Sequence, residues 1–300
     1  MVPECISLGL RKKTASVMST DTVIKSPKGA AAEYAKHSFS AYKRCTNQCQ
    51  YCYLNRGVLS KALGTGTPEL RSCFKNEDEV VRKFAKEIES QKEQLIADGG
   101  IFFSFITDPC LPETMALTIH CASTATLNGV PVTILTKMAG WMNDTMFGLS
   151  ALKNINKDGL LCFGFTLTGH DEMEPYASPN AERISAMKLL HDNGIKTFAS
   201  IEPIIDFDSS IDMIMKSIDS CDLFRIGLRS GVKSDYYDRS KLAYFIGQVE
   251  GLVRFKEFHP KVYWKQSIRK SIHFSDPDYW TSLRCYVDSD YNIFSGVKGR

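Results

Sequence analysis

The feature that most constrains the fold is a regular alternation of short apolar runs with amphipathic helical patterns. The apolar runs are rich in β-branched and aromatic residues, and the segments between them place apolar residues along one helical face. Near-continuous apolar strands that alternate with such helices are typical of parallel strands covered by helices. We expect strands at residues 38–44, 101–106, 130–136, 160–168, 195–202 and 223–228, and a further strand at 261–265.

Helices are expected between these strands. The clearest covers residues 77–97, where Asn76 and Glu79 form a capping box and apolar side chains follow on one face. Gly129 and Gly194 end two of the other helices, because glycine readily adopts the backbone conformation found after a helix C-terminus. The other predicted helices cover residues 113–127, 179–193, 209–219 and 238–257.

Six strand–helix units fit between residues 38 and 257, and neither a sequence repeat nor a Pro/Gly/Ser-rich linker divides them. We therefore expect one α/β domain, either an open doubly wound sheet or an incomplete β/α barrel. In both architectures ligands gather at the carboxyl ends of the strands, so the residues that follow each strand are candidate site residues. Residues 1–28 are polar and predict an extended or poorly ordered arm.

Composition excludes several classes of protein. The chain is 43% hydrophobic and 24% charged, and its 17 Phe, 12 Tyr and 3 Trp exclude a fully disordered chain. No apolar run is long enough to span a membrane, and the first residues lack the apolar segment of a signal peptide. We therefore expect a cytoplasmic protein whose cysteines are reduced. Cys121, Cys162 and Cys221 lie in apolar stretches and should be core residues.

Three of the ten cysteines, Cys45, Cys49 and Cys52, lie within eight residues directly after the first predicted strand. Three soft thiolate ligands suit either zinc or an iron–sulfur cluster. A structural zinc site needs a fourth ligand, which His37 or Cys73 could supply. A [4Fe–4S] cluster held by three cysteines keeps one iron open for a small molecule. On these residues alone, both alternatives stay open.

The CxxxCxxC spacing, with an aromatic residue before the last cysteine, resembles the signature of the radical S-adenosylmethionine (radical SAM) enzymes. The resemblance covers roughly residues 29–265, which leaves an N-terminal arm at 1–28 and a C-terminal extension at 266–300. Its motifs follow the order of the branch related to spore photoproduct lyase: GAAAEYAKHSFSAYKRCTNQCQYCY, FSFITDP, VPVTILTK, FGFTLT, SPNAERISAMKLLHDNGIK and SIEPIID.

This resemblance implies a partial (β/α)6 TIM-like barrel with a [4Fe–4S] cluster held by Cys45, Cys49 and Cys52. It also implies that the open iron binds the amino and carboxylate groups of S-adenosylmethionine (SAM). One electron then cleaves the sulfonium and releases a 5′-deoxyadenosyl radical, which abstracts hydrogen from the substrate. Such enzymes need an electron donor such as a flavodoxin or ferredoxin.

The resemblance assigns the residues near the first three strands to SAM. Tyr51 should lie beside the adenine. Thr107 and Asp108 should accept hydrogen bonds from the methionine ammonium, although Asp108 could instead start a turn or cap the next helix. Lys137 should pair with the methionine carboxylate, and its alternative is an ordinary surface lysine.

The later strands supply the remaining candidates. Thr166 or Thr168 should reach the ribose, since strand alternation puts both on one face, although threonine is also a common structural residue in strands. Glu202 closes the fifth strand, where the family approaches the adenosine. Arg183 should pair with Glu202 or with the methionine carboxylate, and otherwise is an exposed helical arginine.

One position departs from the pattern of spore photoproduct lyase. In that enzyme a cysteine directly precedes the position of Thr107 and returns a hydrogen atom to the repaired base. Ile106 stands here and has no exchangeable S–H hydrogen, so repair of thymine photoproducts by that route is not expected. Cys110 is the candidate catalytic cysteine, and a small residue at the start of a helix is its alternative interpretation.

The substrate is left open by the sequence, and the net charge of +3 neither supports nor excludes nucleic acid. A nucleic-acid substrate calls for basic residues beside aromatic ones, although such clusters are also common on solvated surfaces. We consider an enzyme acting on a nucleotide, nucleic acid or other small substrate, an enzyme that modifies a peptide or protein, and a noncatalytic zinc-stabilised interaction protein. The candidate basic clusters are Arg11, Lys12, Lys13, Lys25 and Lys28, and Lys265, Arg269 and Lys270 beside Tyr263 and Trp264.

Overall fold

The computed structural model describes residues 22–57, 60–144, 148–233, 235–256, 260–272 and 278–295, and every structural statement below concerns these residues. Their strands form an eight-stranded sheet and a two-stranded sheet. The larger sheet contains β1 (Ile24–Lys25), β2 (Ser38–Phe39), β5 (Ile101–Phe103), β6 (Val132–Thr136), β7 (Leu161–Thr166), β8 (Lys196–Ile204), β9 (Leu223–Leu228) and β10 (Lys261–Trp264). The smaller sheet pairs β3 (Tyr42–Lys43) with β4 (Glu69–Leu70).

The helices lie between the strands, as the sequence pattern predicts. The longer ones are α2 (Glu77–Ala97), α3 (Met115–Leu127), α4 (Leu149–Ile155), α5 (Asn180–Asp192), α6 (Phe207–Ser217) and α7 (Arg239–Arg254). The short ones are α1 (Ser60–Leu63), α8 (Gln266–Arg269) and α9 (Tyr279–Ser282), with single turns at η1 (Gly29–Glu33), η2 (Tyr53–Asn55), η3 (Gly140–Asn143), η4 (Asp171–Met173) and η5 (Ile218–Ser220). The sequence analysis missed α4, because seven residues are too few to display a helical period.

The N-terminus of α2 confirms the predicted cap. The side chain of Asn76 accepts a hydrogen bond from the backbone N–H of Glu79 at 2.9 Å. The carboxylate of Glu79 reaches back to the backbone N–H of Lys75 at 2.7 Å, one residue before the position expected for a capping box. The cap therefore satisfies two backbone donors at the start of the longest helix.

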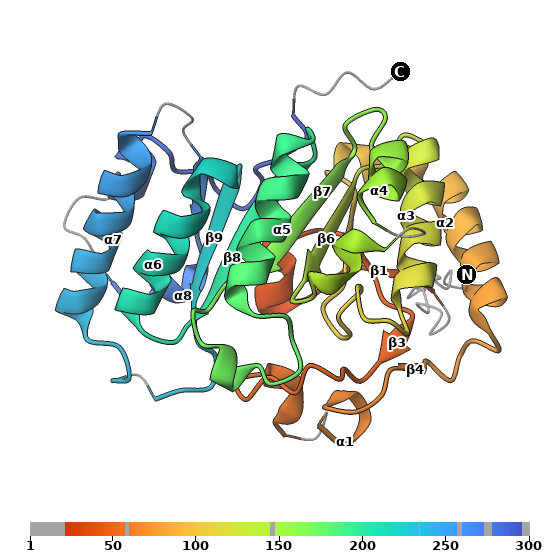
Figure 1. The fold of residues 1–300 in the computed structure, drawn as a ribbon, viewed down its shortest axis with the longest axis horizontal. Helices are drawn as coiled ribbons and strands as arrows, with labels where there is room; N and C mark the ends of the chain where they lie inside the picture. The colour runs from red at the N-terminus through yellow and green to blue at the C-terminus, as the bar shows by residue number, and fades with distance from the viewer. Residues whose placement is uncertain are drawn as a thin grey trace, which may run out of the picture.

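The order of the strands decides between the two predicted architectures. From β2 to β10 the strands of the larger sheet run parallel, and each pairs with the strand of that sheet that follows it in sequence, so the order never reverses. Right-handed crossovers that always advance in one direction put every helix on the same face, whereas a doubly wound sheet reverses at a switch point. Figure 1 shows α2 to α7 as one layer in front of the strands. The doubly wound alternative is therefore wrong.

The α/β class and the parallel sheet are confirmed, but closure of a barrel is not. β1 pairs antiparallel with β2 at one end of the sheet, and β10 lies at the other end. These two ends are not paired with each other in the part of the chain that the structure describes. The (β/α)6 barrel therefore stays a prediction.

The first predicted strand, 38–44, divides into two. β2 joins the large sheet, whereas β3 leaves it to pair with β4. Arg71, just after β4, holds the turning chain: its guanidinium donates to the carbonyl of Ser40 at 2.9 Å, and its backbone N–H donates to the carbonyl of Ala41 at 2.9 Å. This departure from the sheet lets the following residues lie across the carboxyl ends of the strands.

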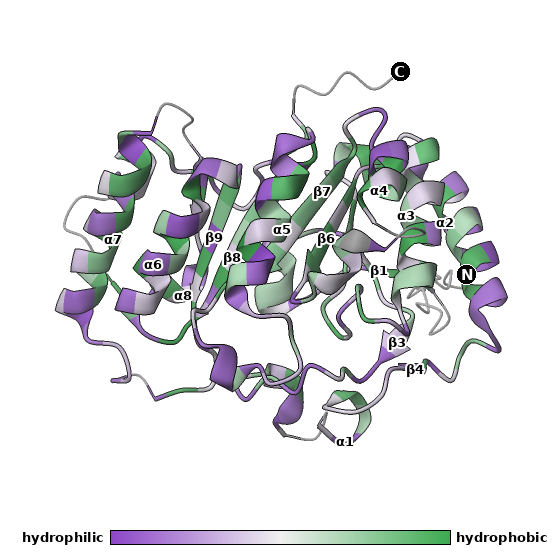
Figure 2. Cartoon of the chain, in the orientation of Figure 1, coloured by the Kyte–Doolittle hydropathy of each residue, from purple (hydrophilic) through white to green (hydrophobic). Residues whose placement is uncertain are grey.

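Alternation along the strands divides the apolar side chains between two clusters. Side chains that face the helices form the larger core, and Cys121 and Cys221 belong to it. Cys162 belongs to a smaller cluster on the opposite, inner face. All three cysteines are fully buried, which confirms their predicted core positions. Figure 2 shows hydrophilic and hydrophobic residues alternating along the helices.

The sheet curves around its inner face. The ring of Tyr34 lies 5.4 Å from that of Phe102 in β5, and 4.8 Å from the guanidinium carbon of Arg225 in β9. Four strand spacings separate β5 from β9, which amounts to about 19 Å in a flat sheet. One side chain can contact both strands only because the sheet bends. Residues 29–35, which precede β2, fill the concave side.

The C-terminal extension packs on the same inner face and covers the edge of β10. The backbone N–H of Val262 donates to the carbonyl of Cys285 at 2.8 Å, and the N–H of Val287 donates to the carbonyl of Val262 at 3.0 Å. Ile293 and Phe294 then join the inner cluster. The extension thus covers part of the sheet.

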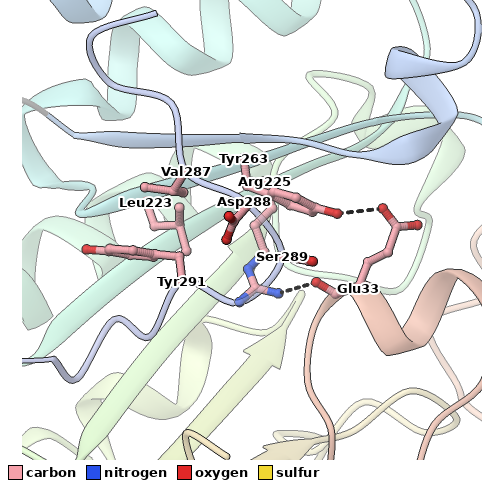
Figure 3. A pocket seen from close by; sticks show the side chains of 8 residues that line it. All are labelled: Glu33, Leu223, Arg225, Tyr263, Val287, Asp288, Ser289 and Tyr291. Carbon is pink, nitrogen blue, oxygen red and sulfur yellow. Dashed lines mark hydrogen bonds between the residues drawn. The ribbon is translucent and has the colours of Figure 1, made fainter. Parts of the chain in front are cut away.

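A small polar pocket separates the extension from β9 and β10 (Figure 3). The guanidinium of Arg225 donates to the carbonyl of Glu33 at 3.3 Å, and the hydroxyl of Tyr263 donates to the carboxylate of Glu33 at 2.8 Å. These two hydrogen bonds connect η1 to β9 and β10, the last two strands of the larger sheet. The pocket is lined by Glu33, Leu223, Arg225, Tyr263, Val287, Asp288, Ser289 and Tyr291.

The predicted arm lies mostly outside the described residues, as do Arg11, Lys12 and Lys13. Its last residues include β1, whose backbone is fixed by Glu87 of α2: the N–H groups of Val23 and Ile24 donate to that carboxylate at 3.0 and 2.8 Å. No helix in the described parts of the chain combines the length and apolar character needed to cross a bilayer.

Gly164 of β7 offers a test of the inner packing. A Cβ at this position would lie 2.0 Å from the ring of Phe198 in the neighbouring strand. We expect Gly164→Ala to lower the free energy of unfolding by about 1–3 kcal/mol, because a ring packed in the core cannot move aside. The control is Gly247→Ala in α7, where a Cβ meets nothing within 4 Å and alanine should stabilise the helix by up to about 1 kcal/mol. Urea unfolding of both variants measures the difference, and equal midpoints would contradict the packing.

Candidate active site

The segment that carries the three clustered cysteines, which we call the cysteine loop (residues 45–52), follows β3 at the carboxyl ends of the strands. Figure 1 shows α1, β3 and β4 at that end of the molecule. Arg44 and Gln48 have φ angles of 66° and 50°, in the left-handed region that non-glycine residues rarely adopt. The N–H of Cys52 donates to the carbonyl of Cys49 at 3.0 Å, which closes the last turn of the loop.

Two neighbouring loops hold the cysteine loop in place. The backbone N–H of Gln50 donates to the carbonyl of Met173, in the loop after β7, at 2.9 Å. The side-chain amide of Asn47 donates to the carboxylate of Asp108, after β5, at 2.9 Å. The hydroxyl of Tyr53 also donates to a backbone carbonyl of the segment after β5. These hydrogen bonds therefore fix the cysteine loop at the carboxyl ends of the parallel strands.

The cysteines themselves differ in exposure. Cys49 is buried, and Cys45 and Cys52 are partly exposed, and none is in a disulfide. Burial raises the pKa of Cys45 to about 12 and also raises the pKa of Cys49. The positive charge of Lys137 acts on both of these thiols in the opposite direction. Lys137, which directly follows β6, is thus near enough to influence the charge of Cys45 and Cys49.

A tetrahedral zinc site would need a fourth ligand close to the three thiolates. Three thiolates around one zinc ion would bring their sulfurs within about 4 Å of one another. Among the residues described, no group of three Cys, His, Asp or Glu side chains is arranged to hold a single metal ion. His37, which the sequence offered as a fourth ligand, instead pairs with Asp98 at 2.8 Å. In a four-iron cluster each of the three cysteines binds a different iron, and the fourth iron needs no protein ligand.

Asp108 joins three segments of the site. One of its oxygens accepts hydrogen bonds from the N–H of Cys110 at 3.0 Å and from the hydroxyl of Thr136 at 2.6 Å. The other accepts from Asn47 and from the N–H of Lys137 at 2.8 Å. A carboxylate has about four acceptor positions, so Asp108 has little capacity left for a methionine ammonium. Its position agrees with the alternative interpretation as a turn residue.

Thr107 and Asn47 carry buried polar atoms without internal partners. Thr107 is 4% exposed and Asn47 is 2% exposed. Within the described residues, neither the hydroxyl oxygen of Thr107 nor the amide oxygen of Asn47 has a hydrogen-bond partner. Buried polar atoms of this kind are uncommon, because each one costs about 1–3 kcal/mol when its water is removed. Asn47 belongs to the cysteine loop, and Thr107 directly precedes Asp108, which binds Asn47, so both atoms are suited to a polar ligand at this loop.

Lys137 and Thr166 meet on the inner face. The ammonium of Lys137 lies 3.3 Å from the hydroxyl of Thr166 and 5.7 Å from the centre of the Tyr51 ring. The structure therefore brings these three predicted site residues together. The predicted strand 160–168 ends at Thr166, however, so alternation does not extend to Thr168. The hydroxyl of Thr168 is buried and accepts a bond from the N–H of His170 at 3.2 Å.

Arg183 has a partner that the sequence analysis did not predict. Its guanidinium pairs with the carboxylate of Glu174 at 2.6 Å, and both side chains are fully buried. It also donates to the carbonyls of Ser178 at 2.6 Å and Thr166 at 2.8 Å. The predicted pairing of Arg183 with Glu202 is therefore wrong. The interpretation as an exposed helical arginine is also wrong, because Arg183 is 0% exposed.

The Glu174–Arg183 pair holds the cysteine loop through a hydrogen bond with Tyr51. The hydroxyl of Tyr51 donates to the carboxylate of Glu174. Burial, followed by the charge of Glu174, raises the pKa of Tyr51 well above its ordinary value. The predicted site residue Tyr51 is thus held in place by an ion pair between the loop after β7 and α5.

Glu202 belongs to a second polar cluster on the inner face. Lys265 donates to both of its carboxylate oxygens, at 2.9 and 2.8 Å, and the hydroxyl of Tyr34 donates to one of them at 2.6 Å. Gly227 leaves the necessary room, because a Cβ there would lie 3.0 Å from the Glu202 carboxyl group. Burial, followed by the charges of Cys52 and Glu202, raises the pKa of Tyr53, which follows the cysteine loop. Through Tyr34 and Lys265, Glu202 is held on the inner face of the sheet.

The structure changes the interpretation of the basic residue Lys265 and of the thiol residue Cys110. The side chain of Lys265 is only 2% exposed, so it is not part of a basic surface. Arg269 lies over the rings of Trp280 and Tyr286, at 6.0 and 5.8 Å. Cys110 is 3% exposed and packs in the core, and burial raises the pKa of its thiol well above the usual range. This burial favours a structural role for Cys110.

The sequence analysis missed Glu174 and Tyr34 and misplaced Lys265. Glu174 lies in a polar stretch after the fourth predicted strand, so inspection of that whole loop would have found it. Lys265 directly follows β10, so inspection of the residues after each strand points to it as well. Tyr34 precedes the first strand, and no local pattern indicates that its side chain reaches across the inner face.

Known proteins were compared with the chain at the level of sequence and of structure. No protein-family model and no curated protein sequence matches it. Spore photoproduct lyase, in a mutant form, superposes with a TM-score of 0.55 at 13% identity, over 80% of this chain and 78% of the lyase. SuiB from Streptococcus suis bound to S-adenosylmethionine superposes with a TM-score of 0.53 at 15% identity, over 88% of this chain and 61% of SuiB.

The chain has their fold. SuiB bound to the precursor peptide SuiA gives a TM-score of 0.53 at 14% identity, over 80% of this chain and 53% of SuiB. The predicted resemblance to radical SAM enzymes, including spore photoproduct lyase, is therefore confirmed at the level of the fold. The chain spans about three fifths of SuiB or less.

The buried ion pair beneath the cysteine loop can be tested directly. Glu174→Gln keeps the size of the side chain but leaves the Arg183 guanidinium without a counter-charge. We expect this change to lower the free energy of unfolding by about 3–5 kcal/mol. The matched control is Glu182→Gln on the exposed face of α5, which should change stability by less than about 0.5 kcal/mol. Urea unfolding measures both values, and similar losses in the two variants would contradict a buried pair.

Proposed function

We propose that the chain is a radical SAM enzyme, in which Cys45, Cys49 and Cys52 hold a [4Fe–4S] cluster and SAM is cleaved reductively. The observation that carries this proposal is the fixed position of the cysteine loop. It lies at the carboxyl ends of the parallel strands, tied to the loops after β5 and β7, and two buried polar atoms, one in Asn47 of the loop and one in Thr107 after β5, lack internal partners. The fold shared with SuiB and spore photoproduct lyase supports the same conclusion.

The residues around the loop divide into ligand-binding and positioning groups. The hydroxyl of Thr107 would accept a hydrogen bond from the methionine ammonium, and Lys137 would pair with the methionine carboxylate. Tyr51 would lie along the adenine, and Thr166 would reach the ribose. Asp108, Glu174 and Arg183 act through other residues, because their hydrogen-bonding groups are engaged within the protein.

When bound, the cluster and SAM would supply a 5′-deoxyadenosyl radical for hydrogen abstraction. The chain itself orients the methionine moiety through Lys137 and covers the inner face of the sheet with residues 29–35, which limits the access of water. The proposal includes the partial (β/α)6 barrel, a reducing cytoplasm, and an electron donor such as a flavodoxin or ferredoxin.

The substrate class has two candidates. A nucleotide or nucleic acid agrees with the resemblance to spore photoproduct lyase, but the burial of Lys265 removes one lysine from a basic cluster that favoured it. A peptide or protein substrate is favoured by the likeness to SuiB bound to a precursor peptide. We propose the peptide-modifying enzyme as the second function.

Anaerobic purification and reduction test the enzyme itself. We expect about four iron and four sulfide per chain, and formation of 5′-deoxyadenosine when dithionite and SAM are added. Iron analysis and chromatography of the nucleoside products measure the two quantities. One zinc ion per chain in place of iron would sink the proposal, as would an intact cluster that yields no 5′-deoxyadenosine.

Substitution of single cysteines separates ligands from core residues. Cys49→Ala should abolish cluster binding, because a four-iron cluster cannot be retained stably with two protein thiolates. Cys162→Ala should keep the cluster, since Cys162 lies in the inner apolar cluster. Iron content after anaerobic reconstitution measures both, and equal iron loss in the two variants would overturn the assignment.

Thr107→Val tests the hydroxyl without an internal partner. Valine has nearly the same shape, and no internal hydrogen bond is lost, so the free energy of unfolding should change by less than about 0.5 kcal/mol. Affinity for SAM should fall about tenfold or more, because a bond to a charged ammonium is removed. Calorimetric titration of the reconstituted protein with SAM measures this effect. Unchanged affinity would exclude Thr107 from the SAM site.

A further inference from the structure

His170, in the loop after β7, has a carboxylate on each of its ring nitrogens. Its Nδ1 lies 2.6 Å from Glu172 in the same loop, and its Nε2 lies 2.5 Å from Asp206, the N-cap of α6 after β8. His170 is 24% exposed, and the two carboxylates are more exposed. The imidazole therefore links the segments that follow two neighbouring strands.

This geometry requires a protonated ring. A neutral imidazole has one N–H donor and one acceptor nitrogen, so one of the two carboxylates would face a lone pair. Only the imidazolium can donate to both. Burial by itself lowers the pKa of His170, but the hydrogen bonds to Glu172 and Asp206 outweigh it and raise that pKa above the ordinary value. The third carboxylate of the loop, Asp171, is directed at Asn180, so it does not compete for the ring.

The segment next to His170 is the one that holds the cysteine loop. η4 directly follows His170, and the carbonyl of Met173 accepts the bond from the N–H of Gln50. Glu174, the next residue, binds Tyr51 and Arg183. An interaction that fixes His170 at the start of this segment therefore also restricts the movement of Met173 and Glu174, which contact the cysteine loop.

We propose that His170 is a positioning residue: as an imidazolium that bridges Glu172 and Asp206, it holds residues 171–174 against the cysteine loop. As pH rises and the ring loses its proton, this restraint weakens. The bridge is complete at low pH, where the ring is protonated in both folded and unfolded chains. It is lost as pH rises through the pKa of the folded protein, because one ring nitrogen then loses its proton. The link to catalysis rests on the proposed function, whereas the bridge itself does not.

Amide hydrogen exchange of the purified full-length chain between pH 5.5 and pH 8.5 tests the bridge, after correction for the intrinsic pH dependence of exchange. Protection of residues 171–174 should fall about two- to fivefold across this range, which is the range expected for a partly exposed ion pair. His170→Gln should give the low protection at every pH. His170→Arg keeps a positive charge throughout and should give high protection at every pH.

A matched pair of N-cap variants separates the ion pair from the cap. Asp206→Asn keeps a good cap for α6 but removes the negative charge that faces His170, so its profile should resemble that of His170→Gln. Asp238→Asn makes the same change at the N-cap of α7 and should leave the profile of the wild type. A wild-type profile for Asp206→Asn would overturn the proposal.

The ring can also be observed directly. Nuclear magnetic resonance of the chain with labelled histidines, with His170→Gln to assign the signal, should give His170 a pKa above the ordinary 6.5 that falls in Asp206→Asn. A value at or below 6.5 would refute the bridge. Iron retention of the reconstituted protein over the same pH range tests the consequence for the cysteine loop. If the chain holds no cluster, exchange and titration still decide the bridge, so the two proposals fail separately.

Discussion

A parallel sheet whose helices all lie on one side leaves its other face without a cover, and this constraint governs the rest of the molecule. Parallel strands are stable only when both faces are buried. Here the sheet bends, and the chain's own ends fill the concave side. Residues 29–35 cover this inner face from one end of the sheet, and residues 285–294 cover it from the other end. The candidate site residues accordingly lie at the carboxyl ends of the strands, around the cysteine loop.

At those carboxyl ends the inward positions carry polar side chains. Lys137, Thr166, Glu202 and Lys265 occupy the last inward positions of β6, β7, β8 and β10, or the residue just after them. Buried charges are costly unless they are paired, and each charge here has a specific partner or lies beside the candidate ligand site. Such pairs fix side chains in one arrangement. This rigidity suits a site that must hold a cofactor in a defined orientation.

Much of this fold can be predicted from the sequence, because strand and helix periodicities are local. The runs that became β5 to β10 and the cap at Asn76 depend only on near neighbours in the chain. The partner of Arg183 could not be predicted, because Glu174 lies in an irregular loop whose path has no periodicity. Lys265 looked like a surface residue, because its charge favours exposure unless a distant carboxylate compensates it. The end of β7 at Thr166, and not at Thr168, depends on the buried contacts of the following loop.

The pairing of residues 285–287 with β10 has a consequence for how this protein can be handled. Without that segment, β10 would present free backbone N–H and C=O groups beside an uncovered apolar surface. An exposed strand of this kind recruits strands from other molecules. A shortened chain ending after β10 would therefore be prone to self-association, and fusions are better placed where they leave this segment seated on the sheet.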